Sequence, residues 1–268
     1  MTIFYFTSTG NCLAVAKKIG DPSRAGSNLV SIPQIIGNLQ PEYKDDIIGI
    51  IFPIYGFFLP KIVRRFIAGT KISADYTFAI GTYGNLPGAC MRNAQKYALE
   101  HGSRIDYAES LLMVDNYLPG FEVKDQIAML PKKNTDENLA RIIADITARK
   151  KVNATASVGW RFATAAIRLG EKAVINGKQA QRYIVNGNCI KCGICAKVCP
   201  TRNITVTEDG CSRGAVTFGD NCEACLGCVH NCPKNAIHLK NEKSAERFRN
   251  PDVSLNEIVA ANEQKQTT

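Results

Sequence analysis

Eight of the eleven cysteines lie in one stretch, in two sets with the same spacing. Each set reads C-x2-C-x2-C-x3-C-P, and each cysteine of the second set lies 33 residues after its counterpart in the first. One structural unit therefore occurs twice. Three thiolates on one tight turn can reach three irons of a cubic iron-sulfur cluster, which leaves the fourth iron to a ligand from elsewhere. The cysteines are Cys189, Cys192, Cys195 and Cys199, and then Cys222, Cys225, Cys228 and Cys232.

This spacing resembles that of the bacterial two-cluster ferredoxins. In that family the fourth cysteine of each repeat binds the cluster of the other repeat, so the resemblance implies two [4Fe-4S] clusters with crossed ligands. His230 precedes Asn231 and Cys232, and we interpret it as a surface histidine in preference to a group that tunes a cluster potential. The implied ligand sets are Cys189, Cys192, Cys195 and Cys232 for one cluster, and Cys222, Cys225, Cys228 and Cys199 for the other.

Clustered cysteines have two alternative uses. Paired CxxC units also form four-thiolate zinc sites, but three evenly spaced cysteines followed by x3-C-P fit zinc ribbons poorly. A disulfide framework is disfavoured because the start, Met1 to Phe6, lacks the basic region of a signal peptide. We therefore expect reduced thiols in a cytoplasmic protein.

A second candidate site follows the apolar run from Ile3 to Phe6. A loop rich in hydroxyls comes next, and apolar residues at helical spacing follow it, which predicts a strand, a loop and a helix. The N-H groups at a helix N-terminus favour an anion. The loop resembles the flavodoxin phosphate loop, T/S-x-T-G-x-T, which implies FMN as cofactor, although Cys12 replaces the last hydroxyl and is expected to be a buried, inert thiol. The loop comprises Thr7, Ser8, Thr9, Gly10, Asn11 and Cys12.

Two further loops follow the predicted strands 46–52 and 76–81. In an open sheet of order 2-1-3-4-5, ligands bind beyond the carboxyl ends of the strands, and flavodoxins hold the flavin ring there. No catalytic residue stands out, since Tyr55 and Tyr83 are the only obvious proton donors. The candidate ring contacts are Pro53, Ile54, Tyr55, Gly56 and Phe57 in one loop, and Thr82, Tyr83, Gly84, Asn85 and Gly88 in the other.

The alternation of strands and helices predicts an α/β fold with a parallel sheet. The resemblance to flavodoxins implies a doubly wound, flavodoxin-like sheet of order 2-1-3-4-5, and the resemblance to ferredoxins implies that a small α+β two-cluster domain is joined to it. We place an FMN-binding domain at 1–153, a connecting helix in 154–181, the ferredoxin domain at 182–241, and a tail at 242–268. The tail carries a capping box from Ser254 to Glu257 that opens a short docking helix.

Two finer expectations concern these parts. A hairpin is predicted from strands at 203–207 and 215–218, with Cys211 between them as a free thiol. The connecting helix, 156–172, is expected to bridge the domains with an apolar side that comprises Val158, Phe162, Ala165, Ala166 and Leu169, whereas Trp160 is expected to be a packing residue.

The formal charge of +9 suggests a partner that is a nucleic acid or a membrane surface. Two oxidised clusters, counted with their thiolates, bring about −2 each and a flavin phosphate about −2, which leaves roughly +3. Much of the excess therefore balances cofactor charge. No nucleic-acid module is recognisable, and the longest apolar run is broken by Gly49, Pro53 and Gly56, so no membrane insertion is expected.

Taken together, the chain resembles the flavodoxin-ferredoxin fusion proteins of anaerobic bacteria and archaea over nearly its whole length. The resemblance implies an electron carrier that passes electrons between its clusters and FMN and exchanges them with a redox partner protein. An FMN-dependent oxidoreductase that reduces a small molecule is the alternative enzyme hypothesis, and a scaffold that has lost FMN is a third. Cofactors far apart in one chain would require a homodimer for exchange.

Overall fold

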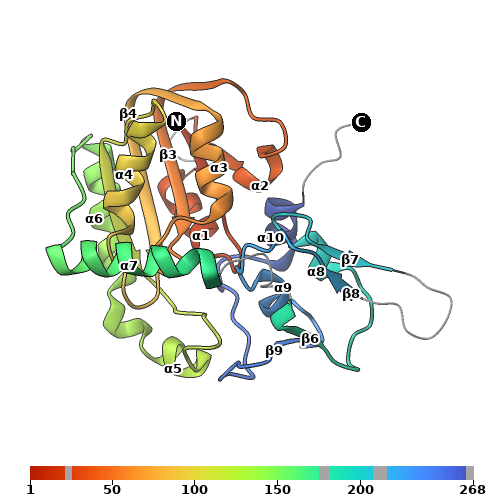
Figure 1. Cartoon of the computed structure of the whole chain (residues 1–268). Helices are drawn as coiled ribbons and strands as arrows, with labels where there is room; N and C mark the ends of the chain where they lie inside the picture. The colour runs from red at the N-terminus through yellow and green to blue at the C-terminus, as the bar shows by residue number, and fades with distance from the viewer. Residues whose placement is uncertain (22–25, 175–180, 208–215, 264–268) are drawn as a thin grey trace.

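A five-stranded parallel sheet organises the N-terminal part of the computed structural model (Figure 1). The structure describes residues 1–21, 26–174, 181–207 and 216–263, and only the backbone at 168–174. The predicted strand order 2-1-3-4-5 is confirmed. In order across the sheet, the strands are β2 (Asn28–Ser31), β1 (Thr2–Tyr5), β3 (Glu42–Pro53), β4 (Lys71–Tyr83) and β5 (Tyr107–Leu112).

The middle strands begin earlier than the sequence pattern predicts. β3 and β4 pair with each other from Glu42 and Lys71 onward, well before β1 joins β3 at Ile48. In these first segments polar residues alternate with Tyr43, Ile72 and Ala74, which pack in or against the second apolar core, so no continuous apolar run marks this part of the strands.

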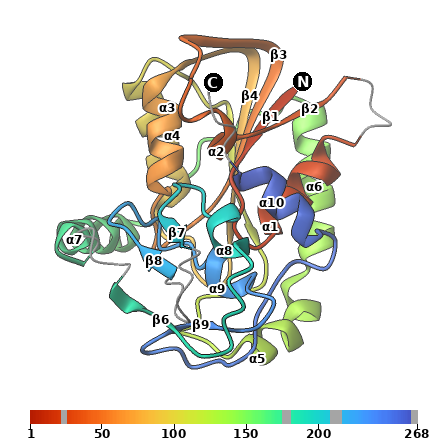
Figure 2. The same ribbon diagram turned by 90° about the vertical axis from the view of Figure 1, so that its right-hand side faces the viewer.

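Alternate residues of each strand face opposite layers of helices. Ile3 and Tyr5 belong to one apolar core with α1 (Asn11–Ile19) and α6 (Thr135–Thr147), whereas Phe4 and Phe6 belong to a second core with α3 (Lys61–Gly69) and α4 (Cys90–Glu100). Figure 2 shows these two helix layers on either side of the strands. The smaller helices of this part are α2 (Ile32–Ile35), α5 (Val123–Ala128) and η1 (Leu130–Lys133).

The cysteine repeats fold into a small unit near the carboxyl ends of the sheet strands (Figure 1). Two antiparallel strand pairs flank two one-turn helices, and β7 with β8 forms the predicted hairpin, although Cys211 lies outside the described residues. A third apolar core joins this unit to Val114, Leu118 and Val123 of the α/β part. Its elements are β6 (Tyr183–Val185), α8 (Ile194–Lys197), β7 (Ile204–Val206), β8 (Val216–Phe218), α9 (Gly227–His230) and β9 (Ile237–Leu239).

The C-terminal helix α10 (Leu255–Asn262) returns to the α/β part. Its capping box is formed, because the Ser254 and Glu257 side chains each accept a hydrogen bond from the other residue's backbone N-H. Ile258 and Ala261 are buried in the same core as α1. The polar tail thus ends in a helix that packs on the sheet layer, as the sequence predicts for a docking helix.

The connecting helix α7 (Val158–Val174) presents a different face from the one expected. Val158 and Phe162 are 62% and 73% exposed, so the predicted apolar side does not bridge two domains. Trp160 instead packs on the Phe57 ring at 5.4 Å between centroids, and Thr164 Oγ1 accepts a hydrogen bond from Ala89 N. Alanines at 165 and 166 bury too little apolar area to dictate which face docks.

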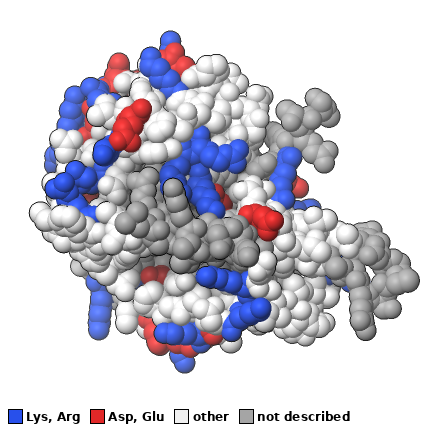
Figure 3. Space-filling model, viewed as in Figure 1, with Lys and Arg blue, Asp and Glu red and all other residues white. Residues whose placement is uncertain are grey.

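Basic side chains gather over α3 on the face that Figure 3 shows, and α3 carries Lys61, Arg64 and Arg65. Within the described residues, no helix combines the length and the apolar character that crossing a bilayer demands.

Close packing at the centre of the sheet gives a first prediction. A Cβ added at Gly49 would lie 2.2 Å from the fully buried Phe78 ring, so Gly49→Ala should destabilise the fold by about 1–3 kcal/mol. Thermal unfolding should show an apparent Tm lower by about 2–4 °C per kcal/mol. Gly37→Ala, at an exposed glycine with open space around it, is the control. Equal Tm values for the two variants would contradict this account of the sheet.

Candidate functional site

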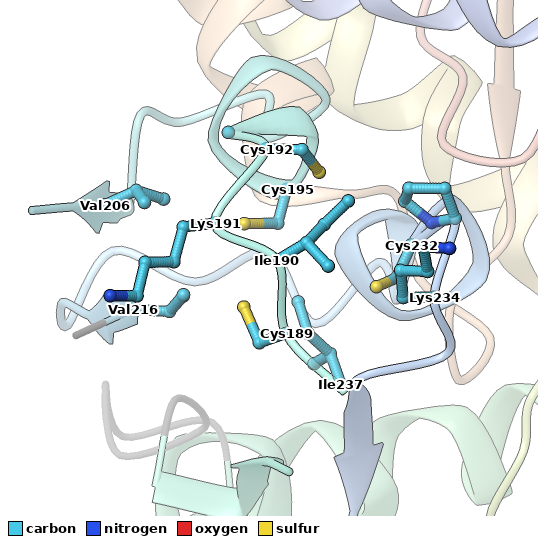
Figure 4. Close-up of a pocket in the computed structure, with 12 residues that line it drawn as sticks. Cys189, Ile190, Lys191, Cys192, Cys195, Val206, Val216, Cys232, Lys234 and Ile237 are labelled. Atoms are coloured by element: carbon cyan, nitrogen blue, oxygen red, sulfur yellow. The ribbon is translucent and has the colours of Figure 1, made fainter. Parts of the chain in front are cut away.

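The first three cysteines of repeat one meet a cysteine of repeat two. Figure 4 shows Cys189, Cys192 and Cys195 around one pocket with Cys232, and Ile190 and Ile237 also line it. Burial, together with the charges of the other three cysteines nearby, raises the pKa of Cys195 to about 11. This is the grouping that crossed ligation would require.

The other four cysteines form the complementary set. Burial raises the pKa values of Cys225 and Cys228, and the charges of neighbouring Cys222 and Cys199 raise them further. Cys199 comes from the first repeat, so each set draws one member from the opposite repeat. Both repeats must therefore fold together for either set to be complete.

Backbone N-H groups point at several of these sulfurs. Asn203 N donates to Cys199 Sγ and Ala236 N to Cys232 Sγ, each at 3.2 Å, at equivalent positions of the two repeats. Ala224 N donates to Cys222 Sγ at 3.3 Å. Such donors stabilise thiolates over thiols, which is the form that binds iron. The donor set therefore fits iron-sulfur clusters.

The two sets differ in their access to solvent. Each set has one buried cysteine, Cys195 and Cys228, but Cys192 of the first set is exposed, whereas the other three cysteines of the second set are only partly accessible. Cys225 also packs against the apolar core beneath α3 and α4. Only the first set therefore presents a cysteine at the surface.

His230 is buried, so the interpretation as a surface histidine is wrong. Its Nδ1 accepts a hydrogen bond from Phe248 N, which leaves Nε2 to donate to Asn116 O at 2.8 Å. Burial lowers its pKa to about 4. The ring therefore links three distant segments as a neutral group.

The three predicted flavin loops do meet at one edge of the sheet. Tyr55, after β3, bonds through its hydroxyl to Ser8 Oγ at 3.0 Å, and Cys12 Sγ lies 3.2 Å from Thr82 Oγ1, at the end of β4. The Cys12 thiol is buried, as expected, and burial raises its pKa to about 12, which favours the protonated thiol over the reactive thiolate.

The predicted ring contacts pack mainly on one another. Phe57 has a left-handed backbone, and a Cβ on Gly88 would lie 2.8 Å from its ring. A Cβ on Gly84 would lie 2.2 Å from Asp115, while Gly56 and Asn85 are exposed and Pro53, Ile54 and Tyr83 are half-buried.

The predicted phosphate loop is covered by other parts of the chain. Thr7, Ser8 and Thr9 are only 2%, 6% and 4% exposed, and Asn11 and Cys12 are also buried. A flavin phosphate needs open N-H and hydroxyl groups at this loop. As they are arranged here, the residues do not fit that group.

Sequence reasoning missed the residue that clamps the second set to the sheet. Glu223, next to Cys222, accepts hydrogen bonds from Lys61 N at 3.0 Å and from Ile62 N at 2.6 Å. These N-H groups open α3, where the helix dipole favours a carboxylate. No local signal marks this role, because the partners lie about 160 residues apart in the chain.

Removal of this clamp gives a second prediction. Glu223→Ala should leave the two N-H groups of α3 without their acceptor and cost about 1–3 kcal/mol of stability. Hydrogen exchange at Lys61 and Ile62 should quicken and the Tm should fall. Glu100→Ala, at an exposed carboxylate on α4, is the control. Unchanged exchange at the start of α3 would refute the clamp.

Comparisons with known proteins agree with this site. A family model described as a 4Fe-4S dicluster domain matches residues 188–236. An uncharacterized ferredoxin of Methanocaldococcus jannaschii is 34% identical over 62 residues, which are 23% of this chain and 80% of that protein.

Solved flavodoxin-like structures resemble the N-terminal half weakly. Two-electron reduced Megasphaera elsdenii flavodoxin has a TM-score of 0.30 and 20% identity, over 41% of this chain and 84% of that one. The Trp repressor binding protein of Bacillus subtilis has a TM-score of 0.31 and 14% identity, over 52% and 98%. The fold assignment rests on the strand order of the sheet itself. The chain thus belongs, through its C-terminal part, to the 4Fe-4S ferredoxin family, and that part is fused to an α/β domain of flavodoxin-like fold.

Proposed function

We propose that this protein is an electron carrier that holds two [4Fe-4S] clusters and exchanges single electrons with a redox partner protein. The observation that supports it is the pair of four-thiol sets, each completed by a cysteine of the opposite repeat. A [4Fe-4S] cluster supplies one-electron chemistry when bound. Reduced thiols of this kind suit the cytoplasm, where disulfides are rare.

The unequal exposure of the two sets suggests where the partner docks. The exposed Cys192 lies beside Ile190, which is 58% exposed, and beside the exposed Lys191 and Lys234 at the same pocket. An apolar contact ringed by lysines favours a partner with an acidic rim, because opposite charges speed association. The second set, closed by the α/β domain, would serve as the interior site.

The flavin of the sequence prediction has no part in this proposal, because the loop that would hold its phosphate is covered. The alternative of an FMN-dependent reductase loses its premise for the same reason.

Crossed ligation can be tested with four single variants. Cys232→Ser should remove a ligand from the first set, so its electron paramagnetic resonance spectrum and iron loss should match those of Cys192→Ser. Cys199→Ser should instead match Cys225→Ser. The wild-type protein, purified without oxygen, should contain about eight irons and eight sulfides per chain. A Cys232→Ser spectrum that matched Cys225→Ser would contradict crossing, and zinc without sulfide would end the proposal.

The docking edge gives a further prediction. Lys191→Glu with Lys234→Glu should slow reduction by the dithionite anion about three- to tenfold at low salt, and speed reduction by the methyl viologen cation radical. Salt should remove both effects. Lys44→Glu with Lys96→Glu changes the net charge equally on the α/β domain, and both lysines are exposed there. Equal rates for the two double variants would argue against electron entry at this edge.

A further inference from the structure

The loop from Thr7 to Cys12 is where the ferredoxin part and the C-terminal segment meet the α/β domain. We infer that this loop is the docking seat for the chain's own ferredoxin part and C-terminal segment, and that this docking excludes a flavin phosphate. Three separate segments, each far from the loop in sequence, contact it.

The C-terminal segment lies directly on Gly10. A Cβ built on this glycine would be 2.9 Å from Asn250 Cβ and 3.0 Å from Val253 Cβ, so carbon atoms fill the space above the loop. Asn250 N donates to Thr9 O at 2.8 Å, and Asn250 Nδ2 donates to Asn11 Oδ1 at 3.0 Å. A dianionic phosphate would have to displace these groups and face the apolar Val253.

The ferredoxin part contacts the neighbouring residue, Ser8. Asn231 Nδ2 donates to Ser8 O and to Gly227 O, each at 2.9 Å. A Cβ on Gly227 would lie 3.5 Å from Ser8 Cβ and 3.6 Å from Cys225 Sγ. The turn that carries two cysteines of the second set therefore rests on the loop itself.

Two more asparagines complete the cover. Asn116 Nδ2 donates to Thr9 Oγ1 at 2.6 Å, and Asn262 Nδ2 donates to Thr7 O at 3.0 Å. Together with Asn231 and Asn250, they direct four side-chain amide donors at the loop. A phosphate site needs hydroxyl and N-H donors that are open to the ligand, whereas here Thr9 Oγ1 accepts from Asn116 and the Gly10 N-H donates to Thr7 Oγ1.

The edge of the sheet therefore serves another purpose than nucleotide binding. Strand ends and helix N-termini that could receive a nucleotide hold the second cysteine set in place instead. Asn231 and Asn250 act as positioning residues, because their side chains bond the loop and neither residue is a ligand of a cluster. FMN could bind the predicted loop only after the ferredoxin part had left it.

Flavin binding by the whole protein tests the exclusion directly. Protein purified without oxygen and loaded with clusters should carry no flavin, and FMN at up to roughly 0.1 mM should keep its full fluorescence. Stoichiometric FMN that coexists with a full complement of iron and sulfide would overturn the inference, and would leave the proposed electron transfer intact. Absence of iron and sulfide would instead count against the proposed function.

Hydrogen exchange tests the docking seat. Asn231→Ala with Asn250→Ala removes the side-chain amide bonds to Ser8 O and Asn11 Oδ1, so amides 8–12 should exchange about tenfold faster. Asn38→Ala, at an exposed asparagine remote from the loop in sequence, should leave them unchanged. Exchange that is equal in all three proteins would overturn the docking role. A double variant that failed to fold would leave the flavin measurement to decide.

Discussion

Helix N-termini at the carboxyl edge of a parallel sheet present N-H groups that must find acceptors, and this requirement governs how the chain is assembled. In many α/β proteins a ligand supplies them. Here another part of the same chain covers the edge. Glu223 accepts hydrogen bonds from the two N-H groups that open α3, whereas at the start of α1 Asn250 donates to Asn11 Oδ1 and, with Val253, packs over Gly10. The fold is thus closed by its own C-terminal third.

This closure explains why the two cysteine sets are unequal. The second set lies against the α/β domain through Cys225 and Gly227, whereas Cys192 of the first set stays at the surface. Burial excludes water and lowers the local dielectric, and both influence the potential of an iron-sulfur cluster. The two repeats, whose cysteines have the same spacing, therefore lie in two different environments within one polypeptide.

The excess of basic residues fits the same arrangement. Thiolate-bound clusters carry negative charge, and Lys191 and Lys234 lie at the pocket of the exposed set. If no flavin phosphate binds, the cofactors cancel less of the formal charge of +9. More positive charge is then left to attract an acidic partner. The basic side chains over α3 contribute to the same positive net charge.

What could be predicted from the sequence followed from short-range spacing. The cysteine pattern indicated a duplicated iron-sulfur module, and apolar runs indicated the strands, because strand periodicity and ligand spacing are local properties. The order of the strands came from the resemblance of the loops to those of flavodoxins. The capping box of Ser254 is equally local.

Only the tertiary structure decided what the edge of the sheet holds. The groups that cover Thr7 to Cys12 come from Asn116, Asn231, Asn250 and Asn262, more than a hundred residues away, and a lone asparagine carries no signal of its partner. The tertiary structure also decided which face of α7 docks, since Trp160 packs on the Phe57 ring while Val158 and Phe162 are exposed to solvent. A loop of flavodoxin type shows which chemistry its residues could perform; whether that loop stays open depends on what the rest of the chain packs against it.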